Sequence, residues 1–276
     1  MKEKWRILLP VILICLTLIF LLFVYNNFLG RSPPEEAGGT SAYFVRPETE
    51  SKKGTETEFE TPIGSETEVL AETAPYISPV DFEELAKVNA DIYAWLDIPG
   101  TDISYPLLQH DSDDGYYHRR DMNGNYDING SLYTEGSYNG RDFTDPLTIV
   151  YGHNMDDGSM FGTLQKNYSS KTDLAEKSEI VIYLPDREMH FAVFAAVPYD
   201  KRHILYNYDF SDRRTFRLFF DEILSIRAME AVFAEKASVT SGEQVLILST
   251  CLAGNSKNRF LICAKLAYSE PVAIEN

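Results

Sequence analysis

Three residues of the chain carry the side-chain types needed for acyl transfer through a thioester: Cys251, His153 and Arg259. A thiol has an ordinary pKa of about 8.5, and its thiolate is the strong nucleophile. A neighbouring imidazole can take the thiol proton and later return it to a departing amine. A guanidinium can donate hydrogen bonds to the oxyanion of a tetrahedral intermediate. Brought together, the three groups would suffice to cleave and remake an amide bond.

The positions of these residues along the chain favour such a meeting. His153 ends the apolar run "LTIVYGH", Cys251 follows the run "QVLILST", and Arg259 opens the run "RFLICAKLAY". Residue types and turn spacing predict a strand for each run, so the three side chains are expected at one rim of a sheet. Each residue alone has an ordinary structural interpretation: a small buried cysteine, a histidine in a turn, or a solvated arginine. Their shared placement at strand ends is what suggests a site.

The elements that must position these residues are mostly strands. The segment 98–108 contains a Pro-Gly turn followed by an alternating strand. Residue types that favour strands are also enriched at 130–135, 147–153, 179–185, 189–199, 244–250 and 259–268. One clear helix starts at Asp212, because five bulky apolar residues between Phe216 and Ile226 fall on one face. Ser78 to Asp81 reads as a helix start with Ser78 as N-cap, and Phe82 to Trp95 as one or two short helices. The predicted fold is mainly β, a closed or nearly closed barrel.

The N-terminus carries a membrane-anchor pattern. Residues Ile7 to Tyr25 form a run of 19 residues without a charge, and a helix of that length, at about 1.5 Å per residue, spans a bilayer core. Basic residues precede the run and acidic residues follow it, which predicts a cytoplasmic N-terminus and an outer remainder. A cleaved signal peptide is the alternative, but the run is long and lacks a small-x-small cleavage site. We therefore expect residues 1–30 to be an uncleaved anchor.

Composition separates a second region from the rest. Residues 31–75 contain four basic and ten acidic residues with many Ser, Thr, Pro and Gly, so we expect a solvated, extended tether. Residues 76–276 then form the outer domain. The whole chain has a net charge of −17, which argues against a nucleic-acid partner.

The remaining cysteines and metal-like patterns point away from other functions. A Cys251–Cys263 disulfide is conceivable, but alternation places Cys263 well inside its strand, so we expect free thiols. The segment that starts at Asp121 resembles a calcium loop, but Tyr126 and Leu132 stand where such a loop needs Gly and Glu. The segment "GHNMDDG" around His153 lacks a second His or Cys at the spacing of a metal ligand. We predict no metal and no cofactor, and we assign His110, His118, His190 and His203 structural roles.

The same motifs resemble the sortase family of Gram-positive surface transpeptidases. "LILSTC", followed by Arg259, and "IVYGHNM" about a hundred residues earlier carry the likeness. The segments "ELAKVNADIYAWLDIPGTDISYPLLQ", "GSLYTE" and "GSMFGTL", together with the long helix from Asp212, are similar to class B in particular. The resemblance covers roughly 79–268. In departure from the family pattern, Ile247 replaces the usual Thr, Leu252 replaces a frequent acidic residue, and the segment between Cys251 and Arg259 is short.

The resemblance implies an anchored enzyme on the cell surface. His153, Cys251 and Arg259 fall on its catalytic positions, and Ser249, Thr250, Tyr151 and Tyr117 fall on or near its substrate groove. Its implied partners are secreted proteins with a C-terminal sorting signal, and an amine of a peptidoglycan precursor or a pilin lysine. Two alternatives stay open: a hydrolase that uses the same thioester, and an anchored module that binds peptides without chemistry. Papain-like peptidases are disfavoured, because in them Cys precedes His along the chain.

Overall fold

The computed structural model describes residues 42–47 and 78–271 of the 276-residue chain. Within these ranges no helix combines the length and the apolar character that a bilayer crossing requires. The predicted anchor at Ile7–Tyr25 and most of the predicted tether lie outside the described residues.

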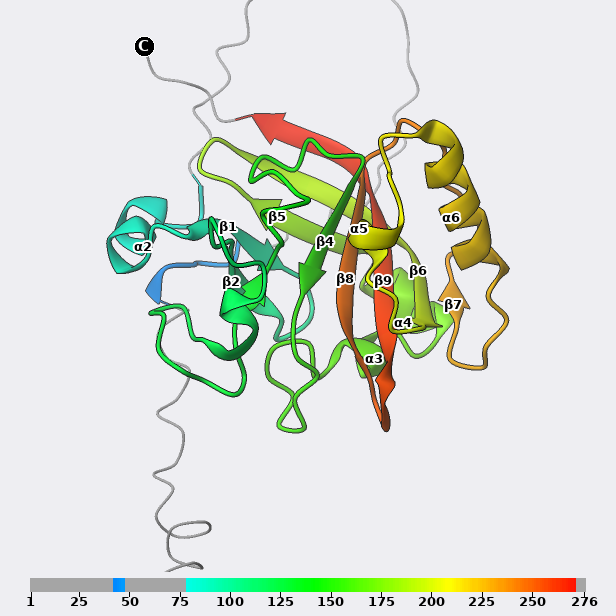
Figure 1. The fold of residues 1–276 in the computed structure, drawn as a ribbon, viewed down its shortest axis with the longest axis horizontal. Helices are drawn as coiled ribbons and strands as arrows, with labels where there is room; N and C mark the ends of the chain where they lie inside the picture. The colour runs from blue at the N-terminus through cyan, green and yellow to red at the C-terminus, as the bar shows by residue number, and fades with distance from the viewer. Residues whose placement is uncertain (1–41, 48–77, 272–276) are drawn as a thin grey trace, which may run out of the picture. The chain divides into compact units, whose positions relative to one another are not determined.

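The described chain is mainly β, as predicted (Figure 1). The strands are β1 (Ile92–Asp97), β2 (Ser104–Leu108), β3 (Leu132–Tyr133), β4 (Leu147–Tyr151), β5 (Glu179–Tyr183), β6 (Arg187–Tyr199), β7 (Val232–Phe233), β8 (Val245–Leu252) and β9 (Asn255–Pro271). The helices are α2 (Phe82–Val88), η3 (Tyr116–Arg119, a 3-10 helix), α3 (Leu164–Asn167), α4 (Lys171–Glu176), α5 (Ile204–Asn207) and α6 (Arg213–Ser225).

The sheet closes into a barrel. Strands follow the order β5-β1-β2-β3-β4-β8-β9-β6-β7, and an additional pairing between β5 and β6 closes the first eight into a ring, with β7 outside it. The side chains that point inward form one core cluster, with Leu246, Leu248 and Phe260 among its members. Closure leaves no free strand edge along the ring, so these strands offer no edge for pairing with the sheet of another molecule.

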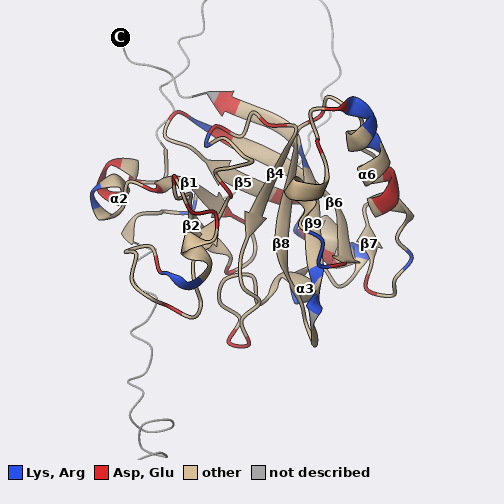
Figure 2. Cartoon of the chain, in the orientation of Figure 1, with Lys and Arg blue, Asp and Glu red and all other residues tan. Residues whose placement is uncertain are grey.

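The outer face of the barrel is covered in two places. Helix α6 lies along β6, β8 and β9 and buries Phe216, Phe219, Phe220 and Ile223 against them, on the face predicted from their spacing. Asp212 caps this helix by accepting hydrogen bonds from the Arg214 and Thr215 amides. Basic residues occupy the first turns of α6 and acidic residues follow further along the helix (Figure 2).

A second outer cluster lies on β1, β2 and β5. Two expectations from the sequence are wrong in this region. The N-cap of α2 is Asp81, which accepts from the Glu84 amide, and not Ser78. Residues Ile92 to Trp95, expected as helix, are the start of β1. Every residue of β1 is buried, because the barrel interior covers one face and this second cluster the other, so the strand shows an apolar run instead of alternation.

The expectation of a solvated tether is wrong for residues 43–46. Phe44 pairs with Val80 and its ring lies 5.4 Å from the Trp95 ring, in stacked geometry. Arg46 forms a salt bridge to Asp97, with Nη2 2.6 Å from Oδ1. The tether was predicted from the composition of residues 31–75 as a whole, in which this short aromatic and cationic stretch is outnumbered by acidic and small polar residues. These residues belong to the barrel domain.

Candidate active site

Cys251 and Arg259 face each other on adjacent strands. They are paired residues of the antiparallel β8–β9 ladder, and Arg259 Nη1 donates a hydrogen bond to Cys251 Sγ at 3.6 Å. The sequence predicted a loop starting at Cys251, but β8 runs on to Leu252 and β9 begins at Asn255. Gly254, with φ of 73°, makes the tight turn between them. A short hairpin therefore holds the sulfur and the guanidinium side by side.

The two described cysteines occupy opposite environments. Both are free thiols, and Cys251 is partly exposed. Cys263 is fully buried under α6, paired with Ile247 and not with Cys251, and burial raises the pKa of its thiol far above the usual value. Leu261 and Cys263 belong to the outer cluster, and strand alternation places Arg259 on the same face of β9. Of the two cysteines that the structure describes, only Cys251 has the exposure that a nucleophile needs.

His153 reaches the same rim from β4. The strands β4 and β8 are parallel neighbours (Figure 1), and their register pairs Tyr151 with Ser249. Continued by two residues, this register brings His153 level with Cys251. The two segments stay joined beyond β4: the Gly152 amide donates to the Ser249 carbonyl at 3.2 Å, and Asn154 Nδ2 donates to the Cys251 carbonyl at 2.8 Å.

His118, assigned a structural role from the sequence, lies beside His153. The His153 Nε2 atom is 2.7 Å from the main-chain oxygen of His118, and the two rings are 4.4 Å apart. Burial lowers the pKa of His118, and the positive charges of His153, Arg119 and Arg259 lower it further. No local sequence pattern predicts this neighbour, because η3 reaches the rim through an irregular segment that is distant along the chain from β4 and β8.

The four predicted groove residues divide into two pairs. Tyr151 is half-buried on the outer face of the barrel and stacks on Tyr133, with ring centroids 5.5 Å apart, and Ser249 is its partner on β8. Thr250 is buried on the inward face of β8, opposite Phe260. Tyr117 is 2% exposed and packs in the second outer cluster. Ser249 is also buried, at 5% exposure, but it lies beside the partly exposed Tyr151 on the outer face, so we keep these two residues as groove candidates.

A polar cluster continues from Tyr151. Glu135 is buried, and its Oε1 atom is 2.9 Å from His203 Nε2, while the Tyr206 amide donates to His203 Nδ1 at 3.1 Å. The Tyr151 and His203 rings lie 6.4 Å apart. Burial raises the pKa of Glu135, and burial together with the Glu135 charge raises the pKa of Tyr151. His203, assigned a structural role from the sequence, thus links α5 to the outer face that carries Cys251.

Comparison with known proteins decides the family. No family model matches the chain. Sortase B of Listeria monocytogenes is 29% identical over 188 residues, an alignment that covers 67% of this chain and 74% of that protein. The chain is similar to the class B sortases over its barrel domain. It is accordingly a cysteine transpeptidase, and its barrel is the fold that the sequence predicted.

Solved structures agree with this sortase assignment. The barrel resembles sortase B of Clostridium perfringens with a TM-score of 0.60 and 21% identity, covering 68% of this chain and 100% of that one. It also resembles a sortase B–substrate complex from Staphylococcus aureus, with a TM-score of 0.57, 25% identity and coverage of 67% and 83%. The first likeness concerns the fold, and the second adds sequence similarity to a substrate-bound relative.

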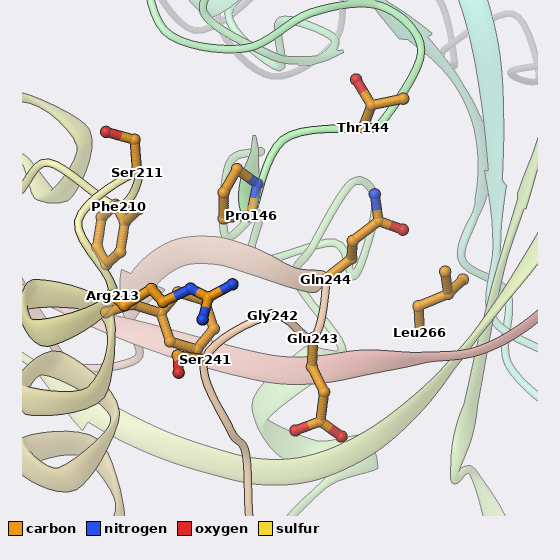
Figure 3. A pocket seen from close by; sticks show the side chains of 11 residues that line it. Thr144, Pro146, Phe210, Ser211, Arg213, Ser241, Gly242, Glu243, Gln244 and Leu266 are labelled. Atoms are coloured by element: carbon orange, nitrogen blue, oxygen red, sulfur yellow. The ribbon is translucent and has the colours of Figure 1, made fainter.

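Two other features of this sortase lie outside the candidate site. A pocket of about 500 Å³ opens at the start of β8 and α6, where Arg213, Gln244 and Thr144 line it together with eight other residues (Figure 3). It contains none of the candidate residues, since Cys251 stands at the other end of β8. In the described part of the chain no three His, Cys, Asp or Glu side chains gather as a metal site. Asp157, near His153, accepts instead from Ser159 Oγ at 2.6 Å.

Proposed function

We propose that this sortase is a membrane-anchored transpeptidase that cuts a sorting motif in secreted proteins and joins the Thr carboxyl to a cell-wall or pilin amine. The observation that carries the proposal is the hydrogen bond between Arg259 and Cys251 at a partly exposed rim. The Asn154 bond to the Cys251 carbonyl supports it, because it ties the segment that carries His153 to the same place.

The proposed cycle has two halves. The Cys251 thiolate attacks the Thr carbonyl, and the guanidinium of Arg259, already within reach of the sulfur, donates to the oxyanion that forms. His153 gives a proton to the departing amine, leaving a thioester on Cys251. An incoming amine then attacks the thioester carbonyl, loses its proton to His153 and releases the thiolate. The products are a new amide and the starting enzyme.

The proposed groove runs along the outer face of the barrel next to Cys251. Ser249 and Tyr151 form its floor, and the cluster of Glu135, His203 and Tyr138 continues it toward α5. A peptide in extended form advances about 3.3 Å per residue, so the residues that precede the Thr would lie over Tyr151 and His203. A sortase B of Staphylococcus aureus solved as a substrate complex supports a substrate-binding groove on this fold.

The proposed location is the outer face of a Gram-positive cell membrane. The uncharged run Ile7–Tyr25, with basic residues before it, supports a single span with a cytoplasmic N-terminus. Because Tyr43 to Arg46 pack on the barrel, only residues 26–42 separate the proposed span from the catalytic domain. The site would then work close to the membrane surface, where secreted substrates and lipid-linked amines meet.

A peptide-library experiment tests the function. The full-length protein in detergent is incubated with fluorescent peptides that contain Thr and vary at the flanking positions, with and without triglycine. Ligation of triglycine to a Thr carboxyl is the expected result. Cleavage that triglycine leaves unchanged would indicate a hydrolase, and binding without turnover would indicate a peptide-binding module; either outcome contradicts the proposal.

A further inference from the structure

The hydrogen bond between His153 and the His118 main chain determines where the imidazole carries its proton. A carbonyl oxygen only accepts, so the His153 Nε2 atom, 2.7 Å away, must be the donor. A neutral imidazole has a single N–H, which this contact places on Nε2. The nitrogen that gains and loses a proton is therefore Nδ1.

The carbonyl that accepts this bond is itself held in place. It belongs to His118 in η3, and the residue before it in the same 3-10 helix, Tyr117, is buried and anchored by its hydroxyl. That hydroxyl donates to Asp91 Oδ2 at 2.7 Å and accepts from Asn89 Nδ2 at 2.8 Å. The Ser131 amide donates to the Tyr117 carbonyl at 3.0 Å, which also holds the peptide unit immediately before the His118 carbonyl. Tyr117 thus has a structural link to the site although it lines no groove.

Gly130 packs directly against the same peptide. It has a φ of +61°, and a Cβ built on it would lie 2.5 Å from the His118 oxygen and 2.8 Å from the Tyr117 oxygen. Such distances are far below van der Waals contact, so any larger residue would have to move the carbonyl. Gly100 offers a matched comparison, because its φ is +78° and nothing lies within 4 Å of its added Cβ.

The side chain of His118 restrains the ring from a second direction. The two rings are 4.4 Å apart and inclined by 38°, so the His118 ring packs against the His153 ring and limits its movement on that side. The lowered pKa of His118 keeps this neighbour uncharged near neutral pH, which avoids repulsion when His153 becomes an imidazolium.

We infer that His118 is a positioning residue, whose carbonyl and ring, anchored through Tyr117 and Gly130, fix His153 so that Nδ1 is the atom that exchanges the catalytic proton. The inference rests on the proposed catalytic role of His153. In the first half of the cycle Nδ1 gives its proton to the departing amine as the C–N bond breaks. In the second half Nδ1 takes a proton from the incoming amine as the new C–N bond forms. Nε2 keeps its proton throughout.

Nitrogen NMR of ¹⁵N-histidine-labelled full-length protein tests this assignment directly. At a pH where His153 is neutral, we expect a protonated Nε2 and a bare Nδ1, and on lowering the pH we expect Nδ1 to take the added proton. A neutral His153 that carries its proton on Nδ1 would overturn the inference. Because this readout needs no substrate, it is independent of the peptide assay. If His153→Ala were as active as the wild type while the NMR spectrum showed a protonated Nε2, the proposed function would be refuted and the tautomer assignment would stand.

Two variants extend the test to the anchor. Tyr117→Phe removes the hydroxyl bonds, and Gly130→Ala displaces the carbonyl; each should give a mixture of tautomers and lower kcat about tenfold or more, with KM nearly unchanged. Gly100→Ala carries the same backbone strain without the collision, and its tautomer and kcat should match the wild type. Wild-type tautomer populations in both Tyr117→Phe and Gly130→Ala would contradict the anchoring role. If Gly130→Ala fails to fold, the wild-type and Tyr117→Phe spectra still decide.

Discussion

The guanidinium of Arg259 lies across the β8–β9 hairpin from Cys251, with Nη1 3.6 Å from Sγ. Because the two residues are ladder partners, their relation is set by main-chain pairing and does not depend on a long loop. The thioester carbonyl would form at this sulfur, so an oxyanion on it would be within reach of the same donor. The geometry places Arg259 beside the reacting atoms in both halves of the proposed cycle.

Removing the guanidinium should therefore slow the chemistry. Loss of one oxyanion donor typically lowers kcat by about 10²–10³, and we expect Arg259→Gln to fall in that range. Arg259→Lys should recover only part of it, because an ammonium lacks the planar fork of donors. Peptide cleavage kinetics measure both. Lys257→Ala removes another cation of the hairpin and serves as the control; its kcat should stay within about twofold of the wild type. An equal loss of kcat in Lys257→Ala would mean that the net charge of the hairpin, and not the donor at Arg259, causes the effect.

Asn154 should act by joining the two halves of the site. Its Nδ2 atom donates to the Cys251 carbonyl at 2.8 Å, so Asn154→Ala removes a tie between the His153 and Cys251 segments. We expect kcat to fall about tenfold, while the free energy of unfolding drops by only about 1 kcal/mol, the usual value of one hydrogen bond. Kinetics and urea unfolding measure the two effects. Ser269 lies near the end of β9, far from Cys251, and its hydroxyl donates to the Glu188 carbonyl on β6. Ser269→Ala removes this hydrogen bond and should leave kcat unchanged.

The packed N-terminal stretch should contribute to stability. Asp97 is 1% exposed, and Arg46 donates to its Oδ1 from both Nε and Nη2. Arg46→Ala leaves this buried carboxylate short of partners, so we expect the free energy of unfolding to fall by about 1–3 kcal/mol. Urea unfolding measures it. Val45→Ala, at a side chain that is 76% exposed, should change stability by less than about 0.5 kcal/mol. Equal values for the two variants would mean that residues 43–46 do not pack as described.

His118 should make the fold sensitive to acid. Its pKa is lowered in the folded protein, chiefly by burial, so the folded state binds its proton less readily than the unfolded state. The stability contribution of His118 is therefore present above its unfolded pKa of about 6.5 and is lost as the pH falls through the lowered folded value. We expect His118→Gln to gain stability relative to the wild type between pH 7 and pH 5. Thermal unfolding curves that shift in parallel over this range would speak against it.

The sequence predicted the parts of the site that follow from strand periodicity. Alternation placed Arg259 and Cys263 on one face of β9, and the spacing of Phe216, Phe219 and Phe220 predicted the buried face of α6. Both patterns depend only on local geometry and one-sided burial. The family resemblance supplied the pairing of His153 with Cys251, which no local pattern fixes.

Other features depend on tertiary contacts that local patterns do not encode. Strand β1 is buried on both faces, so Ile92 to Trp95 lacks a period of two and its apolar spacing predicts a helix instead. The position of His118 depends on how the segment between β2 and β3 folds back, and the packing of Phe44 depends on a pocket formed by Trp95 and Tyr183. Neither could be read before the barrel was known.

The most direct test of the account is the mass of the enzyme during turnover. Full-length protein is mixed with an active Thr-containing peptide from the library in the absence of an amine, quenched in acid, and analysed by intact and peptide-level mass spectrometry. The account predicts an added mass equal to the peptide up to its Thr carbonyl, located on Cys251, labile to hydroxylamine and missing in Cys251→Ala. Turnover by Cys251→Ala at the wild-type rate, or an adduct on another residue, would contradict it.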